Sequence, residues 1–172
     1  MRVGIGYDSH RFASGRPLVL GGVTIPYPRG LAGHSDADAV AHAVADAMLG
    51  AVNLGDIGRL FPDTDPAYKD ADSMLLLAAV HRRVHDEGWT LHQTDVTVIA
   101  QAPTLAPHVG LMQARLAEAL GVDAALISIK AKTNEGMGFI GRAEGIAVFA
   151  VATLMPGVAE EPVTEGLAGS GP

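Results

Sequence analysis

Hydrophobic and polar residues alternate along several stretches of the chain, and a period of two residues predicts β-strands. In the clearest case, Ile127, Ile129 and Ala131 alternate with Ser128 and two lysines. The expected strands are residues 1–7, a pair within residues 17–27 that is divided by Gly21-Gly22, and residues 90–100, 127–132 and 146–154. The last strand is apolar on both faces, so we expect it to be covered on both sides.

Three other stretches carry apolar residues at helical spacing. The expected helices are residues 35–54, 73–86 and 107–120, of which the second ends before Gly88 and the third before Gly121. Ser35 is expected to be the N-cap of the first helix, with Asp36 and Asp38 in its first turn. These signals place three helices between the strands.

The remaining segments are rich in residues that favour turns. Residues 55–72 contain many Gly, Pro and Asp residues and are expected to form a long functional loop. The composition of residues 157–172 predicts a disordered C-terminal tail. Strands separated by helices favour an α+β fold, with a mixed β-sheet and helices packed on one side. Residues 1–156 are expected to be a single domain.

Composition narrows the classes of function. The formal net charge of −7 argues against general nucleic-acid binding, which requires clustered Lys and Arg residues. An anionic substrate would therefore need local cations. The absence of cysteine leaves His and carboxylate side chains as the strong metal ligands. The chain shows no signal-peptide pattern and no apolar run long enough for a membrane span, so a soluble cytoplasmic protein is expected.

Asp8, His10 and His42 form a candidate metal site. Asp8 and His10 are two residues apart in a strand and point to the same face, and His42 lies on the following helix. Two imidazoles and one carboxylate are a ligand set that catalytic zinc uses, with one position left open. Spacing alone equally fits a surface pair and a hydrogen-bonded helix histidine. Asp38 and Asp46, four residues on either side of His42, could orient its ring or could act as a cap and an exposed charge.

Longer motifs in a fixed order extend this interpretation. They are Gly6-Tyr7-Asp8-Ser9-His10, then His34-Ser35-Asp36-Ala37-Asp38 followed by His42, then residues 55–65, then Ala100-Gln101-Ala102-Pro103, then Lys132-Thr133-Asn134-Glu135 with Gly138-Phe139 and residues 141–145. Together they resemble the 2-C-methyl-D-erythritol 2,4-cyclodiphosphate synthase family from residue 1 to about residue 155. The residues beyond Pro156 have no counterpart in the resemblance.

The resemblance implies an enzyme of the non-mevalonate route to isoprenoid precursors. Its substrate would be 4-diphosphocytidyl-2-C-methyl-D-erythritol 2-phosphate, which closes into a cyclic diphosphate with release of CMP. Asp8, His10 and His42 would hold one zinc ion, and Glu135 would hold Mg²⁺ or Mn²⁺ between two phosphates. His34 and Thr133 would stabilise the transition state. The same resemblance implies a homotrimer with active sites between subunits.

The resemblance also assigns substrate-binding residues, although each has an ordinary structural explanation on its own. The segment from Asp56 to Asp65 would hold the erythritol, and the segment from Ala100 to Ala106 would read cytosine through the main chain. The expected contacts are Ser35, Asp56, Ile57, Gly58, Phe61, Asp63 and Asp65, then Ala100, Ala102, Pro103 and Ala106, then Lys132, Phe139 and Arg142. Without the motifs, these would be turn residues and solvated charges.

Two other functions share some of these features. A mononuclear zinc phosphohydrolase would use the Asp8, His10 and His42 site to activate water. A non-catalytic, zinc-stabilised trimeric binding module would use the metal only for assembly, and would be favoured by a fourth protein ligand. The hydrolase leaves Glu135 and the cytosine segment without a role, and no pattern for a fourth ligand is visible in the sequence.

Overall fold

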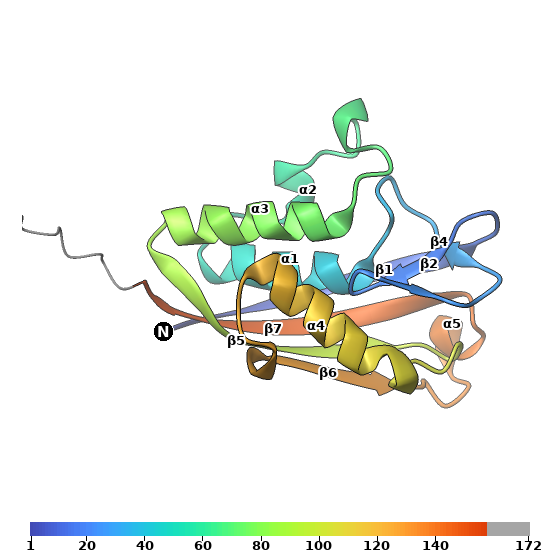
Figure 1. Ribbon diagram of the computed structural model, residues 1–172. Coiled ribbons are helices and arrows are strands. Elements are labelled where there is room, and N and C mark those ends of the chain that lie inside the picture. The colour runs from blue at the N-terminus through green and yellow to red at the C-terminus, as the bar shows by residue number, and fades with distance from the viewer. Residues whose placement is uncertain (158–172) are drawn as a thin grey trace, which may run out of the picture.

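The computed structural model describes residues 1–157 (Figure 1). Its centre is a five-stranded sheet of order β4-β1-β7-β5-β6. The strands are β1 (Arg2–Ala13), β4 (Gly30–Leu31), β5 (Trp89–Ile99), β6 (Ile127–Lys132) and β7 (Gly145–Pro156), and β2 (Leu18–Leu20) pairs with β3 (Val23–Ile25) in a separate hairpin. The β5–β6 pair is parallel and the others are antiparallel, so the prediction of a mixed sheet is confirmed.

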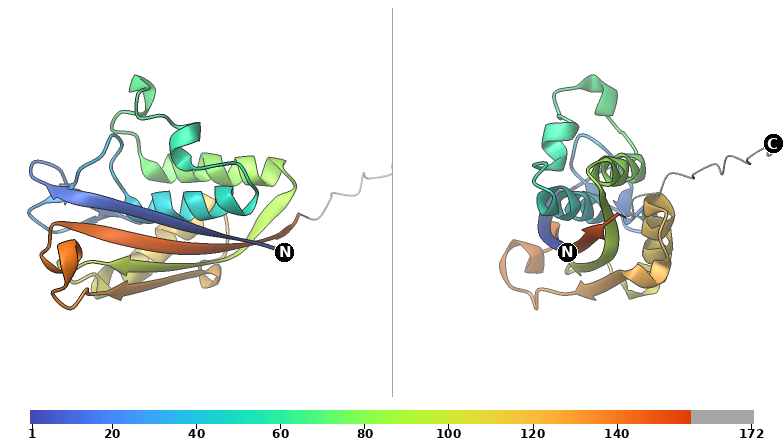
Figure 2. Two further views of the ribbon diagram at one scale, coloured as in Figure 1. Left: turned by 180° about the vertical axis from the view of Figure 1, so that it is seen from behind. Right: turned by 90° about the vertical axis from the view of Figure 1, so that its left-hand side faces the viewer.

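Three long helices cover one face of the sheet (Figure 2). They are α1 (Ala39–Ala51), α3 (Ser73–Asp86) and α4 (Val109–Leu120). Short helices lie in the connections: α2 (Ile57–Leu60), α5 (Gly138–Gly141), and the 3₁₀ turns η1 (Pro66–Tyr68), η2 (Ala106–His108) and η3 (Ala124–Leu126). The loop expected over residues 55–72 therefore contains two short helices. Gly121 ends α4 in the left-handed conformation, as predicted.

The first helix begins later than the sequence suggested, because Asp38 and not Ser35 is its N-cap. The Asp38 carboxylate accepts hydrogen bonds from the amides of Val40 and Ala41 at the start of α1. It also accepts from the amides of Gly21 and Gly22 in the β2–β3 turn. One buried carboxylate thus starts the helix and fixes the hairpin against it.

Strand β1 and helix α1 approach each other closely because glycines face the helix. A Cβ atom on Gly6 would lie 1.9 Å from the carbonyl oxygen of Ala43, and one on Gly4 would lie 2.0 Å from that of Ala47. Both contacts are far shorter than packed atoms allow, so only glycine fits at either position. This contact sets the distance between the strand and the helix.

We expect Gly6→Ala to destabilise the fold by about 3 kcal/mol, because the added methyl group must push α1 away from β1. The matched control is Gly110→Ala on α4, where a Cβ would meet no atom within 4 Å. That change should be neutral or stabilise by about 0.5–1 kcal/mol, since alanine favours a helix. Urea unfolding of the three proteins measures both effects, and equal stability of the two variants would contradict the close contact.

The other face of β7 is not covered in the protomer, contrary to the expectation of burial on both sides. Ile146, Val148 and Ala150 are buried beneath the helices, whereas Phe149 and Val151 on the opposite face are 41% and 38% exposed. They pair across the sheet with Tyr7 and Ile5 of β1, which are also exposed. The open face is therefore apolar along β1 and β7, whereas on β5 and β6 it carries the exposed Asp95–Lys130 ion pair. Apolar residues do occupy both faces of β7, but the described residues place no second layer over this one.

In residues 1–157, no helix has the length and apolar character needed to cross a membrane. The cytoplasmic location stays a prediction. The tail expected over residues 157–172 lies, after its first residue, outside the described part of the chain.

Candidate active site

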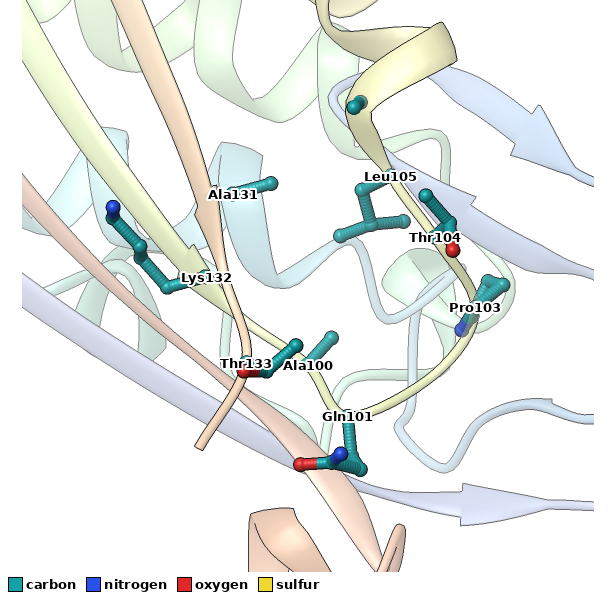
Figure 3. A pocket seen from close by; sticks show the side chains of 9 residues that line it. Ala100, Gln101, Pro103, Thr104, Leu105, Ala131, Lys132 and Thr133 are labelled. Atoms are coloured by element: carbon teal, nitrogen blue, oxygen red, sulfur yellow. The ribbon is translucent and has the colours of Figure 1, made fainter. Parts of the chain in front are cut away.

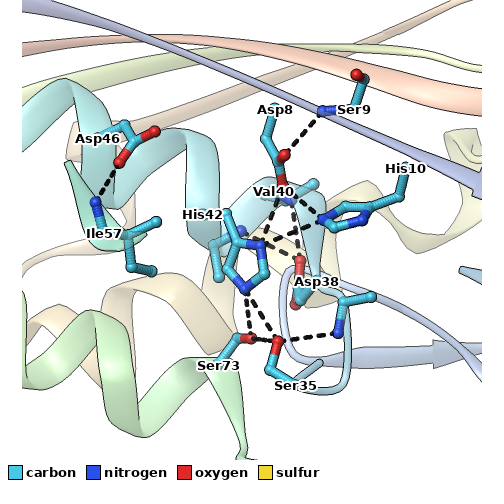
Figure 4. A network of polar contacts seen from close by, with 12 residues as sticks. Asp8, Ser9, His10, Ser35, Asp38, Val40, His42, Asp46, Ile57 and Ser73 are labelled. Atoms are coloured by element: carbon cyan, nitrogen blue, oxygen red, sulfur yellow. Dashed lines mark hydrogen bonds and ion pairs between the residues drawn. The ribbon is translucent and has the colours of Figure 1, made fainter. Parts of the chain in front are cut away.

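Asp8, His10 and His42 converge at the contact between β1 and α1 (Figure 4). Asp8 and His10 follow Gly4 and Gly6 on the face of β1 that meets the helix, and His42 precedes Ala43 on α1. Oδ2 of Asp8 lies 2.9 Å from Nε2 of His10 and 3.0 Å from Nδ1 of His42. The two ring nitrogens are 3.4 Å apart. The predicted cluster is thus brought together by the glycine contact.

Hydrogen bonds on the far side of each ring determine which nitrogens face the centre. Nδ1 of His10 is 2.7 Å from the carbonyl oxygen of Ala32, which can only accept. Nε2 of His42 is 2.9 Å from Oγ of Ser73, whose own proton is directed to the Asp36 carboxylate 2.5 Å away. Both outer nitrogens therefore donate. In the neutral rings, Nε2 of His10 and Nδ1 of His42 are left with lone pairs that point toward Asp8.

Two lone pairs and a carboxylate oxygen at these distances repel one another unless a proton or a cation lies among them. Burial alone would raise the pKa of Asp8, but the hydrogen bonds and charges of His10 and His42 outweigh it and lower the pKa. Burial would likewise lower the pKa of His10, and its contact with Asp8 reverses this and raises it. The donor set of two imidazoles and one carboxylate fits a divalent cation, with a position open for a further ligand.

The ring of His42 is oriented by Ser73, with Ser35 3.3 Å away on the same nitrogen. The two carboxylates considered for this role have other partners. Asp38 caps α1, and Asp46 accepts the amide hydrogen bond of Ile57 at the start of α2. Ser73 was missed because it is 31 residues from His42 in sequence and starts a different helix.

Replacing Ser73 by alanine should weaken divalent-metal binding by roughly 10- to 100-fold, because His42 loses the acceptor that fixes its tautomer and orientation. Competition against a chelating dye measures the affinity directly. Ser14→Ala, in the exposed turn after β1, is the control and should keep the wild-type affinity. Equal affinities of the two variants would show that Ser73 does not orient the ligand.

A cavity of about 130 Å³ opens beside the cluster and contains much of the predicted substrate site. Its lining is His10, His34, Ser35, His42, Ile57, Gly58, Phe61, Asp63, Tyr68 and Leu76. Tyr68 and Leu76 were not predicted. Asp56 and Asp65 do not line the cavity, because their carboxylates cap α2 and η1. The ring of His34 donates from Nε2 to the carbonyl oxygen of Asp65 at 3.2 Å.

A second cavity of about 130 Å³ lies where β5 and β6 end (Figure 3). The predicted residues Ala100, Pro103, Ala106, Lys132 and Thr133 line it. Gln101, Thr104, Leu105 and Ala131 also line it, whereas Ala102 does not. The two cavities have no lining residue in common. Within one protomer, the metal cluster and this second cavity are separate.

Glu135 and Thr133 interact at the rim of the second cavity. Oγ1 of Thr133 donates to Oε1 of Glu135 at 2.6 Å, and both residues are exposed. Glu135 has a φ of 50°, a left-handed conformation that is uncommon for residues other than glycine. The amide of the next residue, Gly136, donates to the side chain of Gln101. These contacts hold an exposed carboxylate next to the cavity.

Phe139 and Arg142 are not brought into either cavity. Arg142 forms an exposed ion pair with Glu144, and Phe139 lines a different hollow whose lining includes His10 and Glu144. In the protomer, Phe139 therefore lies beside the metal cluster but outside its cavity, and Arg142 lines neither cavity.

The chain matches the sequence model of the YgbB family over residues 1–155. A 2-C-methyl-D-erythritol 2,4-cyclodiphosphate synthase from Moorella thermoacetica is 60% identical over 155 residues, which are 90% of this chain and 95% of that protein.

Solved structures agree with this similarity. A 2C-methyl-D-erythritol-2,4-cyclodiphosphate synthase in its CDP-bound form superposes with a TM-score of 0.82 and 39% identity, covering 90% of this chain and all of that one. The bifunctional IspDF from Campylobacter jejuni gives a TM-score of 0.87 and 45% identity. The match covers 90% of this chain but only 42% of the bifunctional protein.

Proposed function

Because the chain belongs to the YgbB family, whose curated relatives are 2-C-methyl-D-erythritol 2,4-cyclodiphosphate synthases, we propose that its histidine cluster and its second cavity are two halves of one cyclising active site. The reaction is that of the family: 4-diphosphocytidyl-2-C-methyl-D-erythritol 2-phosphate becomes 2-C-methyl-D-erythritol 2,4-cyclodiphosphate. An oxygen of the 2-phosphate forms a bond to the β-phosphorus, the bond from that phosphorus to the α-phosphate breaks, and CMP leaves. The enzyme is thus a phosphorus-oxygen lyase of isoprenoid precursor synthesis.

The observation that carries this proposal is the convergence of three metal-ligand atoms beside a cavity that also contains His34. Asp8, His10 and His42 would hold zinc, which when bound supplies Lewis-acid polarisation of a β-phosphate oxygen. His34, at the same cavity, would lie near the attacking 2-phosphate and stabilise the transition state. Ser35, Ile57, Gly58, Phe61 and Asp63 would surround the erythritol.

The second cavity fits the cytidine end of the substrate. It is small, and its lining is dominated by short side chains, so main-chain groups of residues 100–106 are accessible to a planar base. The solved structure of a relative in its CDP-bound form supports nucleotide binding by a protein of this fold. Lys132 would balance phosphate charge, and Thr133 would donate to the phosphate that is transferred. Glu135 would hold Mg²⁺ or Mn²⁺, since such ions prefer oxygen ligands shared with substrate phosphates.

A homotrimer would unite the two halves. The apolar face formed by Ile5, Tyr7, Phe149 and Val151 supports burial against other copies, because monomeric proteins rarely expose a continuous apolar surface of this kind. The separation of the two cavities within one protomer supports a site that takes the metal cluster from one subunit and the nucleotide cavity from its neighbour. Assembly would also bring residues of a neighbouring subunit next to Phe139 and Arg142, which line neither of the two cavities in the protomer.

The product identifies the reaction class. Ring closure consumes no water, so in ¹⁸O-labelled water we expect no label in CMP or in the cyclic diphosphate. Phosphorus NMR should show two coupled signals from the ring. The alternative, a zinc phosphohydrolase, would add one labelled oxygen to a released phosphate. Labelled product, or no turnover at all with zinc and Mg²⁺ present, would contradict the cyclase assignment.

A further inference from the structure

Arg16 joins the β1–β2 turn to the segment that carries His34. Its half-buried guanidinium donates from Nη1 to the carbonyl oxygen of Gly33 and from Nη2 to that of Ser35. These two carbonyl groups belong to the residues immediately before and after His34. The planar fork of the arginine therefore spans the backbone at the position of the histidine.

The turn that carries Arg16 is itself firmly placed. A Cβ on Gly30 would lie 2.2 Å from the carbonyl oxygen of Pro17 and 2.6 Å from that of Arg16, so the backbone of the turn packs directly on β4. Leu18, two residues further on, is fully buried. Arg16 thus extends from a rigid base and not from a loose loop.

The opposite side of the His34 segment is held by residues 65–71. The carbonyl oxygen of His34 accepts from the amide of Asp70 at 2.8 Å, and the amide of Asp36 donates to the carbonyl oxygen of Ala71 at 3.1 Å. The His34 ring donates to the carbonyl oxygen of Asp65. Residues 33–36 are therefore fixed between two anchors, and Arg16 is the anchor on the β1–β2 side.

We infer that Arg16 is a positioning residue for ring closure, which holds the backbone on both sides of His34 so that its imidazole meets the attacking phosphate. This inference rests on the proposed role of His34. Since a displacement of about 1 Å can cost about 100-fold in rate, an anchor for this segment acts on turnover more than on binding.

Two substitutions of Arg16 distinguish the effect of its planar hydrogen-bonding shape from the effect of its positive charge. Arg16→Gln should lower kcat by roughly 10- to 100-fold and leave KM within about three-fold. Arg16→Lys keeps the charge, but a single ammonium group cannot reproduce the planar fork across two carbonyl groups, so kcat should fall nearly as far. Both variants should keep wild-type zinc content, because Asp8, His10 and His42 are not bonded to Arg16. Arg29→Gln removes another half-buried arginine and is the control.

A double-mutant cycle with His34→Ala tests whether Arg16 acts through His34. The double variant should be no slower than His34→Ala alone, because a histidine that is absent cannot be misplaced. If the two losses multiply, or if Arg16→Gln has wild-type kcat or loses zinc, the inference is wrong. If His34→Ala itself keeps wild-type kcat, the proposed role of His34 fails first, which distinguishes the two results.

Discussion

Replacing His42 by alanine is expected to remove the proposed zinc ion and to abolish ring closure. Zinc sites with four ligands contribute about 10–16 kcal/mol, or roughly 2.5–4 kcal/mol per ligand, so losing one should weaken binding about 60- to 700-fold. Only two donors, Asp8 and His10, would remain in the cluster. Without the polarised phosphate, turnover should fall by roughly 1000-fold or more. Elemental analysis of washed protein and an assay of CMP release measure the two effects.

His92→Ala is the matched control, because His92 is an exposed histidine on β5 away from the cluster. It should retain about one zinc per subunit and full activity. Full zinc content in His42→Ala, or a wild-type protein without zinc, would remove the assignment of the site. Partial recovery of activity at high added zinc would agree with it, since a weakened site still binds when the ion is in excess.

The change Glu135→Gln should cause a loss of turnover of roughly 100-fold or more while zinc remains bound. The substitution keeps the shape of the side chain and removes the negative charge that Mg²⁺ or Mn²⁺ requires. It also replaces the charged acceptor of the Thr133 hydroxyl. We expect Mg²⁺ and Mn²⁺ to bind weakly to the free enzyme and well with substrate, whose phosphates complete the oxygen shell. Titration of each ion against CMP release, with zinc measured in parallel, tests this.

Glu118→Gln is the control for Glu135, since Glu118 is an exposed carboxylate on α4 that pairs with Arg115. It should show the wild-type dependence on Mg²⁺ and Mn²⁺. The two-metal proposal would be overturned if the zinc-loaded wild type cyclised at full rate after complete removal of both ions. Normal activity of Glu135→Gln would also overturn the two-metal proposal.

Local sequence signals predicted most of the fold. The alternation over β6 gave its bounds, and Gly121 ended α4 where a left-handed residue was required. The start of α1 was misplaced because Ser35 and Asp38 are both good caps, and the choice depends on the β2–β3 turn that Asp38 also binds. Glycine in the middle of a strand normally destabilises that strand. The close packing of Gly4 and Gly6 on α1 could therefore not be recognised from the sequence alone.

The site was predictable to the extent that its residues belong to contiguous motifs. Asp8, His10 and His42 do converge, and most of the predicted cavity residues line one of the two cavities. The residues that orient them come from distant segments: Ser73 contacts His42, and Arg16 contacts the backbone beside His34. Such contacts depend on tertiary packing, which no local pattern records. Arg142 was assigned to the nucleotide site, yet it pairs with Glu144 in the protomer.

The separation of the two cavities has a genetic consequence if each active site is shared between subunits. A copy of the gene altered at His42 and another altered at Glu135 each encode a protein that is inactive alone. In mixed trimers, some interfaces would join an intact histidine cluster from one polypeptide to an intact Glu135 from the other. Two non-functional alleles could then complement each other in one cell, whereas two alleles altered in the same half could not.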